Sequence, residues 1–200
     1  MIKLLISALA VLLLSAHQIL ADPIVVVDTA PAVPGIQSSS GIPPGPFSVD
    51  IVINDVTDLF AFQFDLSFDP NVISATSITE GPFLQIGGST FFFPGIIDNS
   101  MGRISFVADT ILGVVPGVNG TGVLATVNFT VVSTAFDRSS LTLSDTMLLD
   151  SLKSPITHTT GDGEIRVVPE PTTMLLLGTG LAGVAASVRR WRKSGKGEGT

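Results

Sequence analysis

Hydrophobic and polar residues alternate with a period of two over much of the chain between residues 23 and 168, as in half-buried β-strands. The clearest stretch spans residues 60–68 and carries Ala61, Gln63, Asp65 and Ser67 on its polar face. Its apolar face holds Phe60, Phe62, Phe64, Leu66 and Phe68. Further stretches are 24–27, 49–54, 104–106 (Ile104 and Phe106 on one face), 123–131, 141–143 and 165–167. The pattern predicts a domain built from β-strands.

Turn-forming residues separate these stretches. Segments 43–46, 69–71, 80–82, 87–88, 94–95, 116–117, 119–120 and 161–163 are rich in Pro, Gly, Asn and Asp. The last of them, around Asp162, is expected to form a hairpin turn. No stretch between the termini has the period of an amphipathic helix, and no internal repeat supports a propeller or solenoid. We therefore expect an all-β fold, an antiparallel β-sandwich or jelly roll, over residues 22–168.

The first 21 residues have the features of a secretory signal peptide. Lys3 is their only charged residue, an apolar run covers residues 4–14, and the small Ala21 offers a cleavage point before Asp22. The apolar run is too short to cross a hydrocarbon core of about 30 Å. An uncleaved anchor helix is the alternative interpretation.

The C-terminal segment has three consecutive parts. Pro169, Glu170 and Pro171 precede a run without charged residues over 172–188, and a basic cluster of Arg189, Arg190, Arg192 and Lys193 follows. The run predicts a short transmembrane helix, which the basic cluster would stop on the cytoplasmic side. Residues 194–200 are expected to form a disordered tail. A permanent single-span anchor is one interpretation of this pattern.

This order of features resembles the PEP-CTERM sorting signal of Gram-negative bacteria, over roughly residues 168–193. The resemblance implies that an exosortase processes the precursor near Pro169–Pro171. It further implies export through the inner membrane, a transient membrane anchor, and final release or re-anchoring at the cell surface or outside the cell. Such proteins are associated with exopolysaccharide and biofilm.

Composition and charge narrow the class of protein. Charged residues make up 14% of the chain, against about 25% in typical soluble domains, and there is no Cys and no Tyr. Without Cys, a disulfide scaffold, an iron–sulfur cluster and a Cys nucleophile are excluded. Residues 22–168 carry 15 acidic and four basic residues, a net charge of −11, which repels nucleic acid. These features favour a binding or structural protein over an enzyme.

The central domain resembles the cohesin family over about residues 24–168. The segments that carry the resemblance are 49–53, 59–68, the turn Asp69-Pro70-Asn71 with Val72 and Ile73, 102–106 and 122–129. It implies a jelly roll of about nine strands that binds a partner through a sheet face. In cellulosomes that partner is a dockerin module, and related folds bind polysaccharide.

Phe91, Phe92 and Phe93 form the one candidate ligand face. Three consecutive aromatic residues on a strand cannot all face one core, so either Phe92 or its two neighbours should point outward, or a loop should cover them. A strand buried on both faces is the alternative. Carbohydrate binders commonly stack sugars on exposed aromatic rings, so this cluster also suits a polysaccharide.

No catalytic or metal site is predicted. His158 is expected to be structural or solvated, and the carboxylate pairs Asp65/Asp69 and Asp55/Asp58 are expected to have turn or solvent roles, with Asp65 on a polar strand face. Acidic loops offer the oxygen ligands that calcium prefers, but the twelve-residue calcium-loop pattern is missing. No cofactor is therefore predicted, with a calcium site built from several acidic loops as the alternative.

The leading hypothesis is a secreted, surface-sorted module of cohesin type that contacts polysaccharide or a matrix or dockerin-like protein. The alternative is a self-associating structural matrix protein without a specific ligand, in which exposed strand edges pair between copies.

Overall fold

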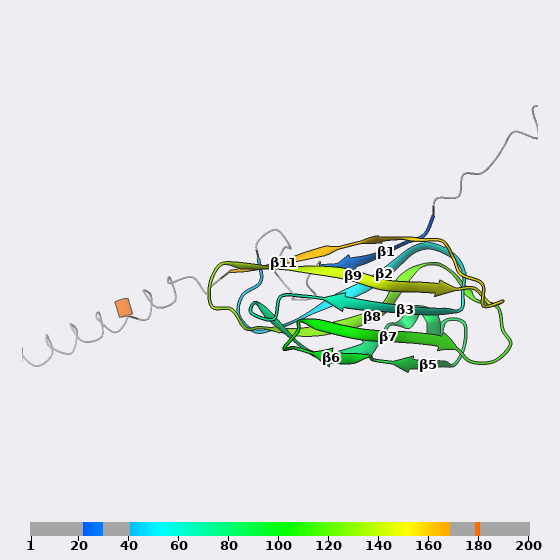
Figure 1. Ribbon diagram of the computed structural model, residues 1–200, viewed down its shortest axis with the longest axis horizontal. Helices are drawn as coiled ribbons and strands as arrows, with labels where there is room; N and C mark the ends of the chain where they lie inside the picture. Colours follow the sequence, from blue (N-terminus) through cyan, green and yellow to red (C-terminus); the bar gives the residue numbers. More distant parts are fainter. Residues whose placement is uncertain (1–21, 30–40, 169–178, 181–200) are drawn as a thin grey trace, which may run out of the picture.

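The computed structural model describes residues 22–29, 41–168 and 179–180, and within them two β-sheets pack face to face (Figure 1). The first sheet has the order β10-β1-β2-β8-β4. Its strands are β10 (Thr159–Gly161), β1 (Ile24–Asp28), β2 (Pro46–Leu59), β8 (Val118–Val131) and β4 (Ile73–Glu80). All its pairings are antiparallel except that of β1 with β10. The predicted β-sandwich is thereby confirmed.

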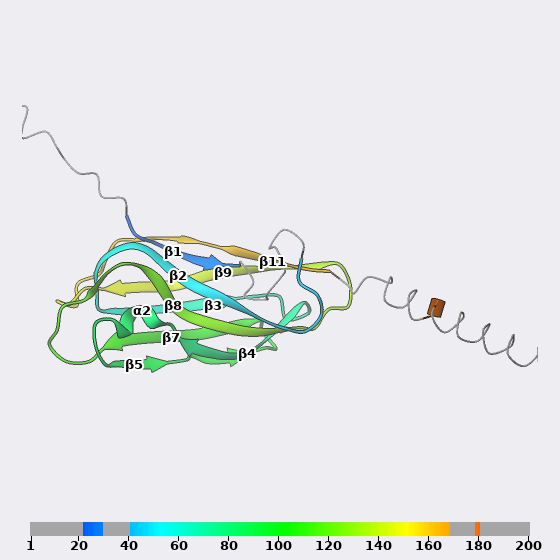
Figure 2. The same cartoon turned by 180° about the vertical axis from the view of Figure 1, so that it is seen from behind.

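The second sheet has the order β11-β9-β3-β7-β5, and β6 also pairs with β7. Its strands are β11 (Gly163–Val167), β9 (Asp137–Leu149), β3 (Ala61–Ser67), β7 (Arg103–Ile111), β5 (Thr90–Phe93) and β6 (Ile96–Asp98). A single helical turn, α2 (Pro82–Gln85), lies near β8 on the side of the first sheet, as seen from behind in Figure 2.

The core lies between the two sheets and is largely aromatic. All five residues of the predicted apolar face at 60–68 are buried. Phe129 of β8 stacks on Phe47 of β2, with ring centroids 5.6 Å apart, and meets the edge of Phe68 at 5.4 Å. Fully burying an apolar side chain of this size contributes about 1.5–3 kcal/mol, so these rings hold the two sheets together.

The described residues form eleven strands, two more than the nine that the family resemblance implied. One added break separates β5 from β6, where Pro94 lacks an amide hydrogen and Gly95 has φ +77°. A Cβ at Gly95 would lie 2.6 Å from the Ser105 carbonyl oxygen, so glycine is required there.

The other break corrects the predicted hairpin turn at Asp162. Strands β10 and β11, on either side of Asp162, belong to different sheets, so the chain crosses from one sheet to the other at this point. The Leu143 amide donates a hydrogen bond of 3.1 Å to Asp162 Oδ1, which fixes the crossing to β9.

The two ends of the described domain lie at opposite ends of the sandwich (Figure 1). Its last paired residue is Val168, whose amide donates to the Ile42 carbonyl oxygen at 2.9 Å. The predictions for residues 1–21, Pro169–Pro171, the basic cluster and the tail lie outside the described residues, as does the predicted membrane run except Thr179 and Gly180. Within the described part of the chain, no helix is long and apolar enough to cross a membrane.

Candidate functional site

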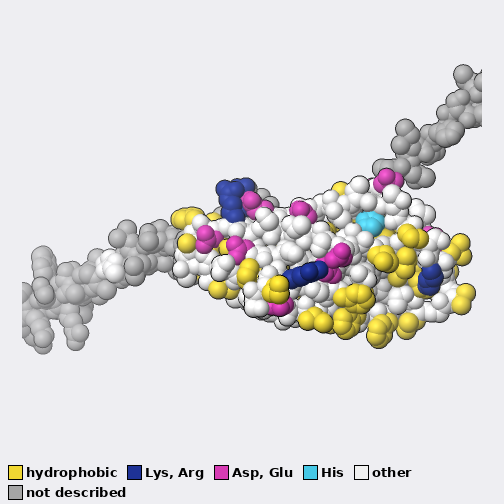
Figure 3. Space-filling view, in the orientation of Figure 1, with side chains coloured by type: hydrophobic (Ala, Val, Ile, Leu, Met, Phe, Trp, Pro, Cys, Tyr) yellow, Lys and Arg dark blue, Asp and Glu magenta, His cyan; other side chains and the backbone are white. Residues whose placement is uncertain are grey.

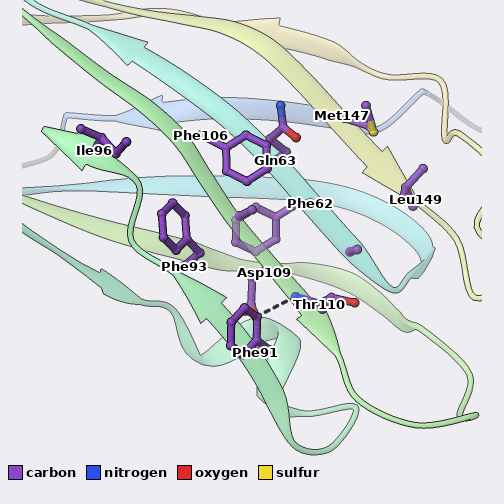
Figure 4. A pocket seen from close by; sticks show the side chains of 12 residues that line it. Phe62, Gln63, Phe91, Phe93, Ile96, Phe106, Asp109, Thr110, Met147 and Leu149 are labelled. Carbon is purple, nitrogen blue, oxygen red and sulfur yellow. Dashed lines mark hydrogen bonds between the residues drawn. The ribbon is translucent and has the colours of Figure 1, made fainter.

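The outer face of the second sheet carries an apolar hollow of about 550 Å³ (Figure 4). Strands β5, β6, β7, β3 and β9 all contribute to it. Its lining residues are Ala61, Phe62, Gln63, Phe91, Phe93, Ile96, Phe106, Ala108, Asp109, Thr110, Met147 and Leu149. In the space-filling view, yellow apolar side chains gather over this part of the sheet (Figure 3).

The aromatic triplet predicted as a ligand face divides between the hollow and the core. Phe91 and Phe93 are 63% and 37% exposed and line the hollow, whereas Phe92 packs against the core. The alternation follows from the pairing of β5 with β7, in which Phe91 lies opposite Thr110 and Phe93 opposite Ala108. The outward placement of its two outer members matches one of the arrangements expected from the sequence.

Phe106 is the site residue that sequence reasoning misplaced. The alternation put it on the same face as Ile104, but Ile104 is buried and Phe106 is 52% exposed, edge-on to Phe93 at 6.0 Å. Phe106 has φ +59°, and the β3–β7 register shifts between Phe64 and Leu66. This β-bulge reverses the direction of the side chain, and no residue type in the sequence signals it.

A buried carboxylate holds that bulge. Asp65 Oδ1 accepts a hydrogen bond of 2.7 Å from the Phe106 amide, and Asp65 Oδ2 accepts one of 2.5 Å from Arg103 Nη2. The same Arg103 nitrogen lies 3.2 Å from Asp145 Oδ2. The expectation of a solvated Asp65 is wrong, because Arg103 covers the carboxylate and leaves the residue only 5% exposed.

These charged residues border a second hollow, which is polar and adjoins the first. Gln63, Phe106 and Met147 line both hollows, while Asp65, Arg103 and Asp145 line only the polar one. The outer face of the second sheet therefore combines an apolar centre with a charged border, the arrangement found in protein–protein interfaces.

A second buried carboxyl group, Asp109, lies on β7, opposite Phe92 of the edge strand β5. It is 2% exposed, its Oδ1 accepts a hydrogen bond from the Thr110 amide, and no described residue donates to its Oδ2. Burial, followed by the charge of neighbouring Glu80, raises the pKa of Asp109 to about 7. The Thr90 hydroxyl donates a hydrogen bond to the Glu80 carboxylate.

The other polar candidates have structural roles. The His158 ring contacts the Ile156 carbonyl oxygen and the Thr146 hydroxyl, each at 2.9 Å. Asp69 accepts from the Asn71 amide, as expected of a turn residue. Hydrogen bonds from the Ser151 side chain, and then from the Gly117 amide, lower the pKa of Asp58. Within the described part of the chain, no three His, Cys, Asp or Glu side chains gather as metal ligands.

Two family models match the sequence. The cohesin domain matches residues 35–167, and the PEP-CTERM protein-sorting motif matches residues 167–190. The sorting motif implies processing by an exosortase and indicates export and sorting to the cell surface of a Gram-negative bacterium. No functionally curated protein matches the chain.

Solved cohesin structures share the fold at low identity. A non-cellulosomal cohesin from the archaeon Archaeoglobus fulgidus is 18% identical, with a TM-score of 0.54 over 77% of this chain and 96% of that one. The third cohesin of ScaC from Acetivibrio cellulolyticus, solved in complex with the ScaB dockerin, is 20% identical, with a TM-score of 0.56 over 73% and 99%.

A third cohesin, in the Coh-OlpA-Doc918 complex from Clostridium thermocellum, is 11% identical, with a TM-score of 0.55 over 74% of this chain and all of that one. Cohesin domains are non-catalytic binding modules, in agreement with the expectation of a binding protein. The matched sequence model covers well over half of the chain, and the two-sheet fold agrees with it. This chain therefore belongs to the cohesin domain family and carries a C-terminal PEP-CTERM sorting motif.

Proposed function

We propose that this protein binds a protein partner, dockerin-like in the sense of the cohesin complexes above, through the apolar hollow on the outer face of the second sheet. The observation that carries the proposal is the cluster of exposed Phe91, Phe93, Phe106 and Met147 side chains around one hollow. Contiguous exposed apolar surface of this kind marks interaction sites in soluble proteins. Arg103 and Asp145 at its border would orient the partner.

A polysaccharide is the second candidate ligand, because Phe91 and Phe93 present exposed aromatic rings. Sugars also require hydrogen-bonding groups to fix their hydroxyls. The apolar hollow offers few, chiefly Gln63 and Thr110, while Asp109 Oδ2 is buried away from solvent. The chemistry of the lining therefore favours an apolar protein surface.

Residues 172–188 would hold the precursor in the membrane until the exosortase acts near Pro169–Pro171. The processed domain would then serve in the extracellular matrix or biofilm. Alkaline extraction of membranes from cells with and without the exosortase tests this step. An alkali-resistant precursor that accumulates without the enzyme supports it, and an extractable precursor contradicts it.

Partner binding is tested with the full-length protein and a Phe91→Ser/Phe93→Ser double variant. Both are compared in affinity for proteins and for exopolysaccharide purified from the producing strain. Loss of one central aromatic anchor commonly costs 2 kcal/mol or more, so we expect protein affinity to fall at least about thirty-fold.

Val52→Ser is the matched control, because Val52 lies half-buried on β2 in the other sheet. If the wild-type protein is retained only on the polysaccharide and the double variant is not, the ligand of this site is a carbohydrate and not a protein. Equal partner affinity in all three proteins would contradict the proposed site.

A further inference from the structure

The folded domain continues to the residue directly before the sorting motif. The Ile42 amide donates to the Arg166 carbonyl oxygen at 2.7 Å, and the Val168 amide donates to the Ile42 carbonyl oxygen at 2.9 Å. Pro169 follows at once, and the run without charged residues begins at residue 172. No linker therefore separates the sandwich from the sorting segment.

This connection limits how far the domain can stand from a membrane. Four residues from Val168 to Thr172 span at most about 14 Å even when fully extended. The polar layer of a bilayer occupies about 5–8 Å on each side of the hydrocarbon core. With the run inserted, the end of the sandwich at Val168 has to lie at or beside the headgroups.

The register of the strands identifies the loops at that end. Val167 pairs with Asp137, Pro46 with Thr130, and Ser67 with Arg103. The loops beside these pairs are 41–45, 68–72, 99–102 and 132–136. The loop from β8 to β9 lies next to the point where the described chain ends (Figure 1). We call this set of loops the exit end.

Apolar side chains at the exit end are exposed. Phe136, Met101 and Val132 are 77%, 76% and 52% exposed, on the loops 132–136 and 99–102. Phe136 also lines a hollow of about 280 Å³ with Val168 and Gly41. Aromatic and aliphatic side chains in such positions partition into the interface between headgroups and acyl chains.

Two of the four basic residues in the acidic domain border the same hollow. Arg138 and Arg166 lie directly opposite each other on β9 and β11, with more than half of each side chain exposed. Glu164 contacts both, at 3.5 Å and 2.7 Å. Basic side chains also lie near this end in the space-filling view (Figure 3). Like charges in register repel, so a further anion between them would be stabilising.

We propose that in the unprocessed chain the exit end rests on the phospholipid headgroup layer, with Phe136, Met101 and Val132 in the interface and Arg138 and Arg166 toward lipid phosphates. The inference rests on the proposed membrane insertion of residues 172–188. Each arginine near an anionic lipid surface is expected to raise the affinity for that surface about five-fold. Processing would then release an apolar surface from the membrane together with the domain.

The opposite end of the sandwich provides the control. Val114 and Leu152 are also exposed there, on loops 112–117 and 150–158. Strand β9, with 13 residues, separates the two ends by about 40 Å. That end cannot reach the headgroups when the exit end does, so a fluorophore attached there should emit as it does in water.

The experiment uses the absence of Cys from the chain, so that one introduced Cys gives one labelled site. Full-length Phe136→Cys, Met101→Cys and Val114→Cys variants are labelled with an environment-sensitive fluorophore. They are reconstituted in vesicles of phosphatidylethanolamine and phosphatidylglycerol. We expect blue-shifted emission and quenching by headgroup nitroxide lipids at positions 136 and 101, with neither effect at 114.

Trp191, the single tryptophan, reports insertion of the C-terminal segment independently. If Trp191 is quenched but the labels at 136 and 101 emit as in water, the proposed contact of the exit end with the headgroups is wrong, while the membrane insertion of residues 172–188 is supported. If Trp191 is not quenched, both the membrane insertion and the headgroup contact are wrong. Insertion of a Gly/Ser linker of about ten residues between Val168 and Pro169 should weaken quenching at 136, since the longer connection lets the domain move away from the membrane surface.

The two arginines are tested by Arg138→Gln/Arg166→Gln in the Phe136→Cys background. Quenching at 136 should weaken in vesicles that contain phosphatidylglycerol and stay unchanged in neutral phosphatidylcholine vesicles. Equal quenching in both lipids, with and without the arginines, would overturn the phosphate contacts.

Discussion

The two sheets of the sandwich share one core but differ sharply on their outer faces. On the first sheet, Ser48 donates to Asn128 at 2.9 Å and Asn128 to Ser77 at 3.1 Å, forming a polar row across β2, β8 and β4. Thr126 of β8 donates to Asp50 of β2 at 2.6 Å. The outer face of the second sheet instead presents phenylalanine and methionine around the apolar hollow.

The difference between the two outer faces indicates which face of the sandwich can bind a partner. Inner faces need only apolar side chains of the right volume. An outer face that satisfies its own polar groups offers little surface that gains from leaving water. The outer face of the second sheet exposes apolar area that gains on burial, so it is the face on which a partner is expected.

The largest expected loss of stability comes from truncating the hydrophobic core that both sheets share. Phe129→Ala should lower the free energy of unfolding by about 3–5 kcal/mol, because it removes a buried ring that contacts Phe47 and Phe68. Phe64→Ala on β3 should cost a similar amount. Chemical denaturation measures both. A much smaller loss for one of them would show that the two sheets do not contribute equally to the core.

The second effect concerns the buried carboxyl group of Asp109 and its neighbour Glu80. The folded-state pKa of Asp109, about 7, lies above its ordinary value of 3.8, so the folded protein keeps a proton that the unfolded chain releases. Its contribution to stability is therefore present below about pH 4 and is lost as the pH rises to about 7, on the order of 2–4 kcal/mol.

Thermal denaturation at pH 5 and pH 8 measures this loss, and Asp109→Asn should remove most of the difference in Tm. Asp50→Asn on the polar face is the matched control and should keep the difference. If Tm falls equally between pH 5 and pH 8 in the wild type and in Asp109→Asn, the raised pKa is not that of Asp109.

The third effect compares two carboxylates on opposite outer faces. Asp65→Ala leaves the Phe106 amide without its acceptor and leaves Arg103 with Asp145 alone, and should cost about 2–3 kcal/mol. It should also loosen the bulge that exposes Phe106 and so weaken partner binding. Asp50→Ala, which loses one hydrogen bond from Thr126, should cost about 1 kcal/mol. Equal losses in urea denaturation would contradict the structural difference between them.

The smallest effect tests the polar row. Asn128→Ala removes hydrogen bonds to Ser48 and Ser77 and should lower stability by about 1 kcal/mol. It should leave partner affinity unchanged. A loss of affinity as large as that of Phe91→Ser/Phe93→Ser would place binding on the first sheet instead.

The class of fold and the core follow from local sequence patterns. The alternation over residues 60–68 is a local property, since successive side chains of any strand point to opposite faces, and all five apolar residues of that stretch are buried. The outward direction of Phe91 and Phe93 follows from the same rule. The sorting motif could likewise be recognised from the sequence, because Pro169–Pro171 and the basic cluster lie close together along the chain.

The completion of the site depends on contacts between distant parts of the chain. The exposure of Phe106 depends on a bulge held by Asp65, 41 positions away in the chain. The raised pKa of Asp109 depends first on its burial and then on the charge of Glu80 from the other sheet. The crossing at Asp162 depends on which sheet each neighbouring strand joins. Strand pairing brings together residues distant in sequence, and a local pattern carries no record of those partners.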